Sequence, residues 1–406
     1  MNKSSKRTLC RLCESDQIIK VIELPETTIG DYFSKTKDEI VVKYPIDLYY
    51  CNKCSHVQVI DVINPEILFH NEFTYMPSNN PSLETHFENY IDFVLKEIPN
   101  PKICVDIGSN DGLFLSIINK KTNAQVLGID PAEGPAQFAI SRGVDTVIDF
   151  FNNKSFNIVK DKFGSVNWIS ANNVFAHNDK LIDMLKQIYG LLDDDGIFTF
   201  EISYLLDIVE KGLIGTIFHE HLSYHSIYSL SSFFKKYNMS LIDVKRVDTQ
   251  GGALIGIVRK GIHYSAENVV SLLSKEKEFG LNKIDGIKKL KIRIESDKKK
   301  LNDIFKIEGI NGNIVAFGAA RSSNLLVEYF DIGRHIKYIV DDNPTKKDKY
   351  FPNYKIPIVP KTVLEKDKPE YIIILAWIHT KKLTDIIKQI SPKSKIITLY
   401  PKIDFI

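Results

Sequence analysis

The sequence has little of what marks membrane, secreted or nucleic-acid-binding proteins. Its 53 lysines and arginines nearly balance 51 acidic residues, so the net charge of +2 gives no reason to expect a nucleic acid or a membrane as partner. No apolar segment follows the basic start, residues 1–6, so no signal peptide is expected. The longest apolar run, residues 371–378, is too short to span a bilayer. We therefore expect a cytoplasmic protein.

Cysteine is also scarce, and its placement is informative. Of five cysteines, four form two C-x-x-C pairs, Cys10 with Cys13 and Cys51 with Cys54. In a reducing cytosol this spacing favours metal binding over disulfides. Four thiolates can hold one Zn²⁺ tetrahedrally and would fill every coordination position, which predicts a structural ion. Free or redox-active dithiols are the alternative.

The turn after the strand predicted at residues 103–108 lacks the G-x-G-x-x-G fingerprint, so a pyrophosphate cradle is not expected there. It carries D-x-G-x-x-x-G instead, and Asp130 closes the next strand, where a carboxylate can accept hydrogen bonds from a ribose diol. Enzymes that use S-adenosylmethionine (SAM) have this pattern; a βαβ unit without ligand is the alternative. The residues predicted to bind SAM are Asp106, Gly108, Asn110, Asp111, Gly112, Asp130, Pro131, Phe151, Asn172 and Asn173.

Strands and helices alternate through most of the chain, which predicts an α/β fold. We expect an N-terminal zinc-binding module at residues 1–72, a central Rossmann-like methyltransferase sheet at 73–262 and a second, smaller Rossmann-like α/β domain at 263–406. A hairpin at 240–259 is predicted to form the edge of the central sheet. A charged helical stretch at 265–306, with apolar residues at helical spacing, leads into the last domain.

The residues 216–225 form the most unusual stretch, because they hold three of only ten histidines together with Glu220 and Tyr224. The order of residues is not the H-E-x-x-H of zinc proteases. A metal site, a site of proton transfer and a polar surface turn are the three interpretations of the stretch by itself.

Taken together, the motifs resemble the sugar C-methyltransferases that act on nucleotide-linked 4-keto-6-deoxy sugars. The matching segments keep their order over almost the whole chain. They are C-x-x-C twice, V-D-I-G-S-N-D-G, G-I-D-P-A, N-N-V-x-A-H, F-E-I-S-Y-L, F-H-E-H-L-S-Y, D-T-Q-G-G, F-G-A-A, V-D-D-N-P-T-K, I-P-I and L-A-W. The resemblance implies structural zinc in the first domain, SAM in the second, and a sugar nucleotide between the second and third.

The resemblance also implies roles for individual residues. The family's catalytic groups correspond to Tyr75, His177, Glu220 and His221, with His221 as general base. The chain departs from the family at Phe218, where a tyrosine is usual. The residues expected to bind substrate are Phe218, His219, Tyr224, Gly318, Arg321 and Ser322.

The expected reaction is methylation of C-3 of a thymidine- or guanosine-linked 4-keto-6-deoxy sugar, in the biosynthesis of branched deoxysugars. A monomer is the working expectation. Three alternatives stay open on the sequence: an O- or N-methyltransferase, a non-catalytic nucleotide-binding protein, and a metal-dependent hydrolase built on His219, His221 and His225.

Overall fold

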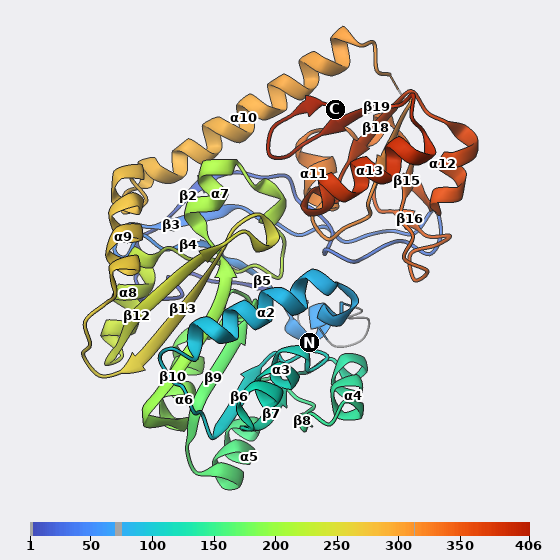
Figure 1. The fold of residues 1–406 in the computed structure, drawn as a ribbon. Helices are drawn as coiled ribbons and strands as arrows, with labels where there is room; N and C mark the ends of the chain where they lie inside the picture. Colours follow the sequence, from blue (N-terminus) through green and yellow to red (C-terminus); the bar gives the residue numbers. More distant parts are fainter. Residues whose placement is uncertain (1–2, 70–74, 312) are drawn as a thin grey trace.

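The computed structural model describes residues 3–69, 75–311 and 313–406. Figure 1 shows three parts in chain order: a small module of strands, a central sheet flanked by helices, and a C-terminal sheet reached through the long helix α10 (Ile284–Ile307). The α/β architecture predicted from the sequence is confirmed. Among the described residues there is no helix of the length and apolarity that a membrane crossing needs. The predicted boundary between residues 72 and 73 lies outside the described residues.

The N-terminal module is completed by a strand from the central part of the chain. Its main sheet has the order β11-β4-β3-β2, and Ser223 of β11 lies opposite Gln58 of β4. The strand Leu48–Cys51 comes shortly after Tyr44, which pairs with Thr27 in an isolated bridge. The elements are β1 (Ser4–Lys6), β2 (Ile18–Ile22), β3 (Leu48–Cys51), β4 (Val57–Val59), β5 (Asp61–Ile63), α1 (Pro65–Phe69) and β11 (Ser223–Tyr224).

The central sheet has seven strands in the order β12-β13-β10-β9-β6-β7-β8. Neighbours are parallel, except that β13 runs antiparallel to both β10 and β12. The predicted hairpin therefore exists, but its second strand is inserted beside β10 and only the first lies at the edge. The strands are β6 (Ile103–Ile107), β7 (Gln125–Ile129), β8 (Thr146–Val147), β9 (Val166–Asn172), β10 (Leu192–Ser203), β12 (Met239–Val247) and β13 (Ala253–Lys260).

Local capping sets where the helices of this part begin. Asn80 accepts a hydrogen bond from the Ser82 N–H, so α2 begins at Pro81. Ser226 and Ser229 form a capping box, so α8 begins at Ile227. The helices are α2 (Pro81–Val94), α3 (Leu113–Thr122), α4 (Glu133–Ser141), α5 (Asn153–Phe163), α6 (Leu181–Leu191), α7 (Leu205–Lys211) and α8 (Ile227–Lys236).

The strand order places a ligand site. From β6 the chain proceeds through β7 and β8 toward one edge of the sheet, whereas β9 and β10 lie on the other side. Connections that leave adjacent carboxyl ends in opposite directions open a crevice there. Asp106 on β6 and Asn172 on β9, two of the residues predicted to bind SAM, lie on the two strands that flank this crevice.

The helical stretch predicted at 265–306 is two helices. α9 (Glu267–Phe279) ends at Gly280, whose φ of +92° is left-handed and terminates the helix. The Gly280 carbonyl then packs against Gly286, where a Cβ would lie only 2.4 Å from its oxygen. Along α10 the apolar residues predicted to repeat at helical spacing are buried, namely Ile287, Leu290, Ile294, Leu301 and Phe305.

The C-terminal sheet also has seven strands, in the order β16-β17-β15-β14-β18-β19-β20. It is smaller because its strands are short. The strand predicted at 371–377 ends at Ile374, and Trp377 begins a 3-10 turn. The elements are β14 (Ile314–Phe317), α11 (Ser323–Tyr329), β15 (Ile336–Val340), β16 (Tyr350–Phe351), β17 (Ile356–Val359), α12 (Lys361–Asp367), β18 (Tyr371–Ile374), α13 (Thr380–Ile390), β19 (Lys395–Thr398) and β20 (Asp404–Phe405).

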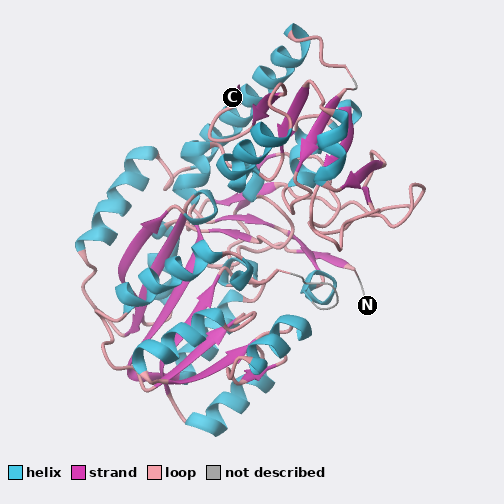
Figure 2. Cartoon of the chain, turned by 45° about the vertical axis from the view of Figure 1, so that its right-hand side comes forward, coloured by secondary structure: helices cyan, strands magenta, loops and turns pink. Residues whose placement is uncertain are grey.

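The N-terminal module lies between the two larger sheets, as both views show (Figures 1 and 2). Its segment between β2 and β3 reaches the C-terminal domain, where Ser34 forms a bridge with Tyr350 and Lys43 pairs with Glu328 at 3.2 Å. The central and C-terminal domains also meet directly. The Trp377 indole lies against Gly215, and the Gly215 N–H donates to the Tyr400 hydroxyl at 3.0 Å.

This last contact makes a prediction about stability. A Cβ at Gly215 would lie 2.3 Å from the Trp377 indole nitrogen, so Gly215→Ala forces the domains apart and is expected to cost about 1–3 kcal/mol of unfolding free energy. Urea denaturation followed by tryptophan fluorescence measures it. Gly134→Ala is the matched control, since nothing lies within 4 Å of a Cβ there. Equal stability of the two variants would contradict the packing.

Candidate functional site

The four paired cysteines converge on one point. Their sulfur atoms lie within 4.8 Å of one another, with Cys10 to Cys54 and Cys13 to Cys51 both 3.6 Å apart. A tetrahedral Zn²⁺ with bonds of about 2.3 Å needs sulfur atoms about 3.8 Å apart, so the thiol set fits zinc. The set agrees with the sequence prediction of a structural ion, because no position is left for water.

The two knuckles are built alike. The residue after each second cysteine, Glu14 and Ser55, has a positive φ of 60° and 61°. Its N–H donates to the carbonyl of the first cysteine of its pair at 2.9 Å in both knuckles. Each turn thereby brings two thiols to the same side of the chain.

The turn after β6 has the shape that its glycines predict. Gly108 and Gly112 have φ values of +73° and +72°, which other residues adopt only with strain. A Cβ on Gly108 would lie 2.2 Å from the side chain of Val174, in the loop after β9. The loops that follow β6 and β9 therefore approach each other closely at the crevice.

Carboxylates hold this turn in place. Asp130, after β7, accepts from the Asn110 N–H and from the Ala132 N–H, both at 2.8 Å. Asp106 accepts from the Ser170 hydroxyl at 2.7 Å, and burial raises the pKa of Asp106 to about 7. The Asp111 carboxylate accepts from the Ser78 N–H at 3.0 Å. Three predicted cofactor residues thus also organise the loops around the crevice.

The amide of Asn172 shows that the crevice is shaped for a polar ligand. Its Oδ1 is buried and accepts no hydrogen bond from the part of the chain that the structure describes. Asn173 follows with φ +55°, donating its N–H to the Glu201 carbonyl. Pro131 and Phe151 are half-buried beside the same sheet edge. An acceptor at the end of β9 suits the ammonium group of an amino-acid ligand such as the methionine part of SAM.

Next to this crevice lie two paired histidines, of which His221 is buried and His177 is half-buried. The rings of His177 and His221 stack with centroids 5.0 Å apart. His177 ends the 3-10 turn η2 (Phe175–His177) after β9, and His221 follows η3 (Ile214–Thr216). The His221 Nδ1–H donates to the Thr216 carbonyl at 2.7 Å, which leaves the lone pair on Nε2. His177 Nε2 is buried without a hydrogen-bond partner among residues 3–69, 75–311 and 313–406.

Burial keeps both rings uncharged near neutral pH. It lowers the pKa of His221 to about 4, although the Thr216 carbonyl opposes the shift. Burial, and then the charges of His221 and Arg321, lower the pKa of His177 well below its ordinary value. A neutral imidazole can accept a proton at once, without first losing one.

Glu220 brings three parts of the chain together. Its Oε1 lies 4.0 Å from the Arg321 Nε of the C-terminal domain, and that nitrogen donates to Asp31 of the N-terminal module at 2.7 Å. Burial raises the pKa of Glu220, and the Arg321 charge opposes this. The Glu220 Oε2 atom is buried and has no hydrogen-bond partner in the described ranges. Gly30 completes the contact, because a Cβ there would lie 3.1 Å from the Arg321 Cβ.

Of the remaining predicted residues, some lie beside the histidine pair or Arg321 and others are buried around them. Phe218 packs on the His221 ring, with centroids 3.9 Å apart, and Tyr75 lies in electrostatic reach of Arg321 and is 45% exposed. His219 is only 1% exposed, with its Nε2 3.3 Å from the Tyr44 carbonyl oxygen. Tyr224 is likewise buried, 6.5 Å from the His221 ring.

In the C-terminal domain the predicted substrate residues occupy one turn. Gly318, with φ +99°, follows β14, and a Cβ on it would lie 2.3 Å from the Ala376 Cβ. Ser322 is buried just before α11. Arg321 is the member of this turn that faces Glu220. Asp31 and Gly30, which meet it, were missed by the sequence analysis, since their segment carries no motif.

The metal-dependent hydrolase alternative needs His219, His221 and His225 to meet at one metal ion, but each of them contacts a different neighbour. His219 faces Tyr44, His221 stacks on His177, and the His225 ring lies 5.2 Å from that of His56. Within the described part of the chain the cysteine cluster is the group with metal-ligand geometry. The stretch is therefore not one metal site.

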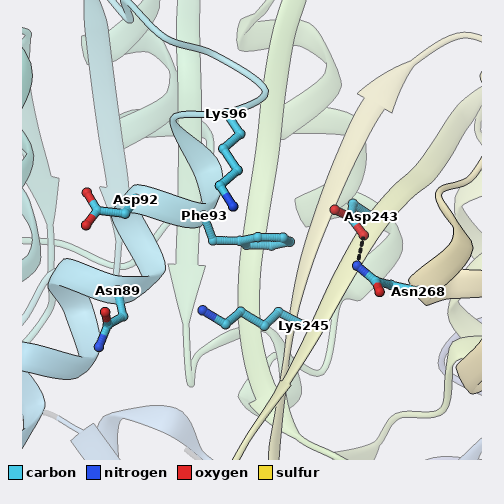
Figure 3. A pocket seen from close by; sticks show the side chains of 7 residues that line it. All are labelled: Asn89, Asp92, Phe93, Lys96, Asp243, Lys245 and Asn268. Atoms are coloured by element: carbon cyan, nitrogen blue, oxygen red, sulfur yellow. Dashed lines mark hydrogen bonds between the residues drawn. The ribbon is translucent and has the colours of Figure 1, made fainter.

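A cavity of 430 Å³ lies elsewhere, between α2, β12 and α9 (Figure 3). The Phe93 ring crosses it between Lys96 and Lys245, and Asn268 donates to Asp243 at 3.0 Å. It contains none of the residues predicted to act on substrate or cofactor, so it is not the candidate active site.

Three family models match the chain in order. Residues 10–69 match "Putative zinc binding domain", residues 83–244 match "Methyltransferase domain", and residues 248–401 match "C-methyltransferase C-terminal domain". The chain belongs to the SAM-dependent C-methyltransferases that carry an N-terminal zinc-binding domain. This excludes the alternatives of a non-catalytic protein and of an O- or N-methyltransferase, and it makes SAM the cofactor.

One similar protein of comparable length is itself a C-methyltransferase. C-methyltransferase NovU of Streptomyces niveus is 26% identical over 384 residues, which are 93% of this chain and 91% of NovU. A solved structure of the plantazolicin methyltransferase BpumL with SAH is 14% identical and covers 45% of this chain and 88% of its own, at a TM-score of 0.36. Magnesium protoporphyrin IX methyltransferase from Synechocystis, solved with SAH, is 13% identical. The match covers 47% of this chain and 90% of that chain, at a TM-score of 0.34. Scores this low carry no inference.

The cysteine cluster makes a prediction about metal content. Cys51→Ser removes one of four thiolates and is expected to lower bound zinc from about one ion per C-methyltransferase chain to near zero, because a structural site needs all four ligands. Elemental analysis after dialysis measures it. Cys104→Ala is the control, since Cys104 is buried in β6 outside the cluster. Zinc kept by the first variant, or lost from the second, would contradict the site.

Proposed function

We propose that this C-methyltransferase methylates C-3 of a nucleotide-linked 4-keto-6-deoxy sugar, a reaction of branched deoxysugar biosynthesis. The nucleotide is a thymidine or guanosine diphosphate. The observation that carries the proposal is the stacked pair of uncharged imidazoles, His177 and His221, beside the crevice proposed to hold the cofactor. A C–H next to a ketone is acidic enough for such a base, so the chemistry needs a positioned imidazole and a donor for the oxyanion.

His221 is the general base in this proposal. Its Nδ1–H is held by the Thr216 carbonyl, so Nε2 takes the proton from C-3. As that C–H bond breaks, its electron pair moves toward the C-4 carbonyl oxygen and gives an enediolate. The Phe218 ring packs against the base and excludes water from one face of it. The tyrosine hydroxyl usual at this position is replaced here by apolar surface.

His177 and Tyr75 stabilise the developing oxyanion. The buried His177 Nε2 can donate a hydrogen bond in the tautomer that protonates it, and burial keeps the ring from becoming a cation in the free enzyme. Tyr75 offers a hydroxyl from the linker before α2. Donors that act where charge appears favour the transition state over the ground state.

Glu220 balances the charge of the base once it is protonated. Glu220 directly precedes His221 in the chain, and its carboxylate is buried. In the resting enzyme the positive charge of Arg321 offsets the negative charge of this carboxylate. SAM supplies an electrophilic methyl group. The residues of this chain generate the enediolate and would orient its C-3 toward that methyl group.

We propose further that the sugar nucleotide lies between the central domain (residues 73–262) and the C-terminal domain (263–406), with the zinc module (1–72) closing one side. The turn of Gly318, Arg321 and Ser322 faces Glu220 across this boundary and offers a cation for the diphosphate. Diphosphate binding far from C-3 supplies energy for positioning the reacting carbon. His219 and Tyr224 shape the wall behind the histidine pair.

Loss of the base tests this mechanism. His221→Gln is expected to lower kcat by about 10²–10⁴-fold without changing SAM affinity, because the ring accepts the proton and does not hold the cofactor. Turnover is followed by mass spectrometry with SAM and both thymidine- and guanosine-linked 4-keto-6-deoxyhexoses. The control is His263→Gln, an exposed histidine far along the chain.

An isotope label tests the proposed proton abstraction separately from the proposed substrate class. A deuterium at C-3 should be lost from the product, because the proposed step breaks that bond. Retention of the label, or normal turnover by His221→Gln, would exclude the mechanism. Absence of a one-methylene mass gain with either nucleotide sugar would instead exclude the substrate class.

The lowered pKa predicts an unusual pH profile. A pKa of about 4 means that His221 in the free enzyme is neutral, and competent as a base, at every pH above that value. We expect kcat/KM, which reports the free enzyme, to stay level from pH 8 to pH 5.5 as far as this histidine is concerned and to fall only as the pH approaches 4. A tenfold fall per pH unit beginning near 6.5, as for an ordinary histidine, would contradict it.

A further inference from the structure

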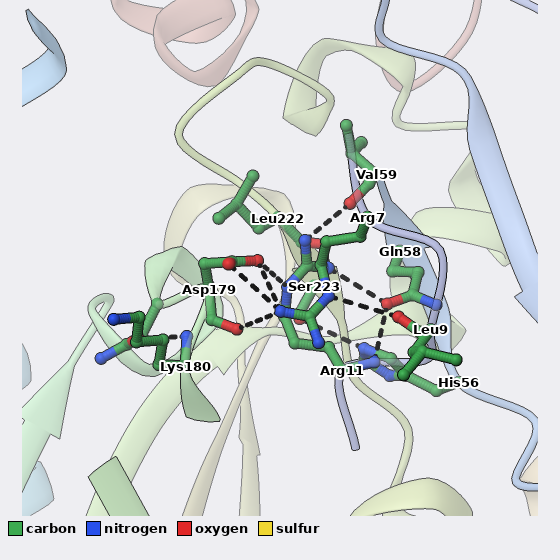
Figure 4. A network of polar contacts seen from close by, with 11 residues as sticks. Arg7, Leu9, Arg11, His56, Gln58, Val59, Asp179, Lys180, Leu222 and Ser223 are labelled. Atoms are coloured by element: carbon green, nitrogen blue, oxygen red, sulfur yellow. Dashed lines mark hydrogen bonds and ion pairs between the residues drawn. The ribbon is translucent and has the colours of Figure 1, made fainter. Parts of the chain in front are cut away.

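Arg11 stands between the two cysteines of the first knuckle, and its buried side chain lies among polar groups of other segments (Figure 4). Its guanidinium donates four hydrogen bonds within the described chain: to Asp179 Oδ1 at 3.1 Å, Gln58 Oε1 at 3.2 Å, the Leu222 carbonyl at 2.8 Å and the Val59 carbonyl at 2.9 Å. A planar fork can serve this many acceptors in fixed directions, which an ammonium cannot do.

Two of these acceptors belong to the loops that carry the histidine pair. Asp179 follows His177 by two residues, and Leu222 follows His221 directly. The Leu222 N–H also donates to the carbonyl of Ala176, the residue before His177, at 3.0 Å. Arg11 therefore closes a ring of contacts around both histidines without touching either.

Arg7 reinforces only one side of this ring. Its NH1 lies 3.1 Å from the Asp179 carboxylate and 3.0 Å from the Asp179 carbonyl, and it is partly exposed. Hydrogen bonds from Arg7 to the His221 loop are not found among the described residues. The two arginines thus offer a natural comparison: both hold the His177 loop, and Arg11 in addition holds the His221 loop.

We propose that Arg11 is a positioning residue that sets the spacing of the His177 and His221 rings and so links the zinc knuckle to the active site. The inference rests on the roles proposed for these histidines. A reacting geometry held by buried, charged hydrogen bonds is sensitive to small displacements, because about 1 Å of misplacement costs about 10²-fold in rate. In this arrangement the zinc knuckle holds Arg11 in place, and Arg11 in turn positions the His177 loop and the His221 loop.

The test compares Arg11→Lys with Arg7→Lys in the full-length, zinc-loaded protein. Histidine carbons Cε1 are labelled with ¹³C, and the signals of His177 and His221 are assigned from their glutamine variants. Arg11→Lys is expected to move both signals, while zinc stays at about one ion per chain and SAH affinity by calorimetry is unchanged. Arg7→Lys is expected to move the His177 signal alone. A purely structural role for Arg11 would move neither ring signal.

The proposal is overturned if both signals of Arg11→Lys coincide with those of the unmodified protein, or if Arg7→Lys shifts His221 as far. Should Arg11→Lys release zinc, Asp179→Ala takes its place, because Asp179 lies outside the knuckles. It is expected to move the His177 signal with zinc retained, and an unmoved signal overturns the proposal equally.

Turnover adds a second readout. With a 4-keto sugar nucleotide that the unmodified enzyme accepts, Arg11→Lys is expected to lower kcat about 10- to 100-fold at unchanged KM, since the spacing of the rings and not substrate contact is altered. A raised KM with full kcat would overturn the proposal. If the unmodified enzyme accepts no such substrate, the proposed function fails, and the ring signals still decide the role of Arg11.

Discussion

The hydrogen bond from the Leu222 N–H to the Ala176 carbonyl joins the two loops on which the candidate site depends. One loop leaves β9 at the cofactor crevice, and the other precedes β11, which belongs to the sheet of the zinc module. Because the bond is made by backbone atoms, it fixes the paths of both loops whatever their side chains are. The same two loops carry the stacked rings of His177 and His221.

Burial is the common cause of the site's electrostatics. It favours the neutral form of every titratable group, so it lowers the pKa of both histidines and raises that of Glu220. Arg321 is the charge that opposes this for Glu220, and it comes from another domain. Glu220 and His221 are neighbours in the chain, and burial shifts their pKa values in opposite directions. Such opposite shifts are common where an acid and a base act together.

The zinc module joins the other domains and does not stand apart from them. β11 completes its sheet, and the segment after β2 reaches the C-terminal domain through Asp31 and Ser34. Gly30 allows the close approach of Glu220 and Arg321, since a Cβ there would crowd both. A structural ion that orders two knuckles therefore also orders the surfaces against which the active-site loops pack.

The sequence by itself determined the features whose partners are near in the chain. The paired cysteines, the glycine turn after β6 and the alternation of strands and helices obey short spacings, so the zinc set, the cofactor and the fold class could be predicted from them. The helix break at Gly280 was missed, because one glycine outweighed the periodicity of the apolar residues. Tertiary structure alone decided the insertion of β13 beside β10, the transfer of β11 to the zinc module, and the pairing of Asp31 with Arg321, which lie 290 residues apart. No local pattern encodes such contacts, since each depends on how whole elements pack, and they are the contacts that bring the candidate site together.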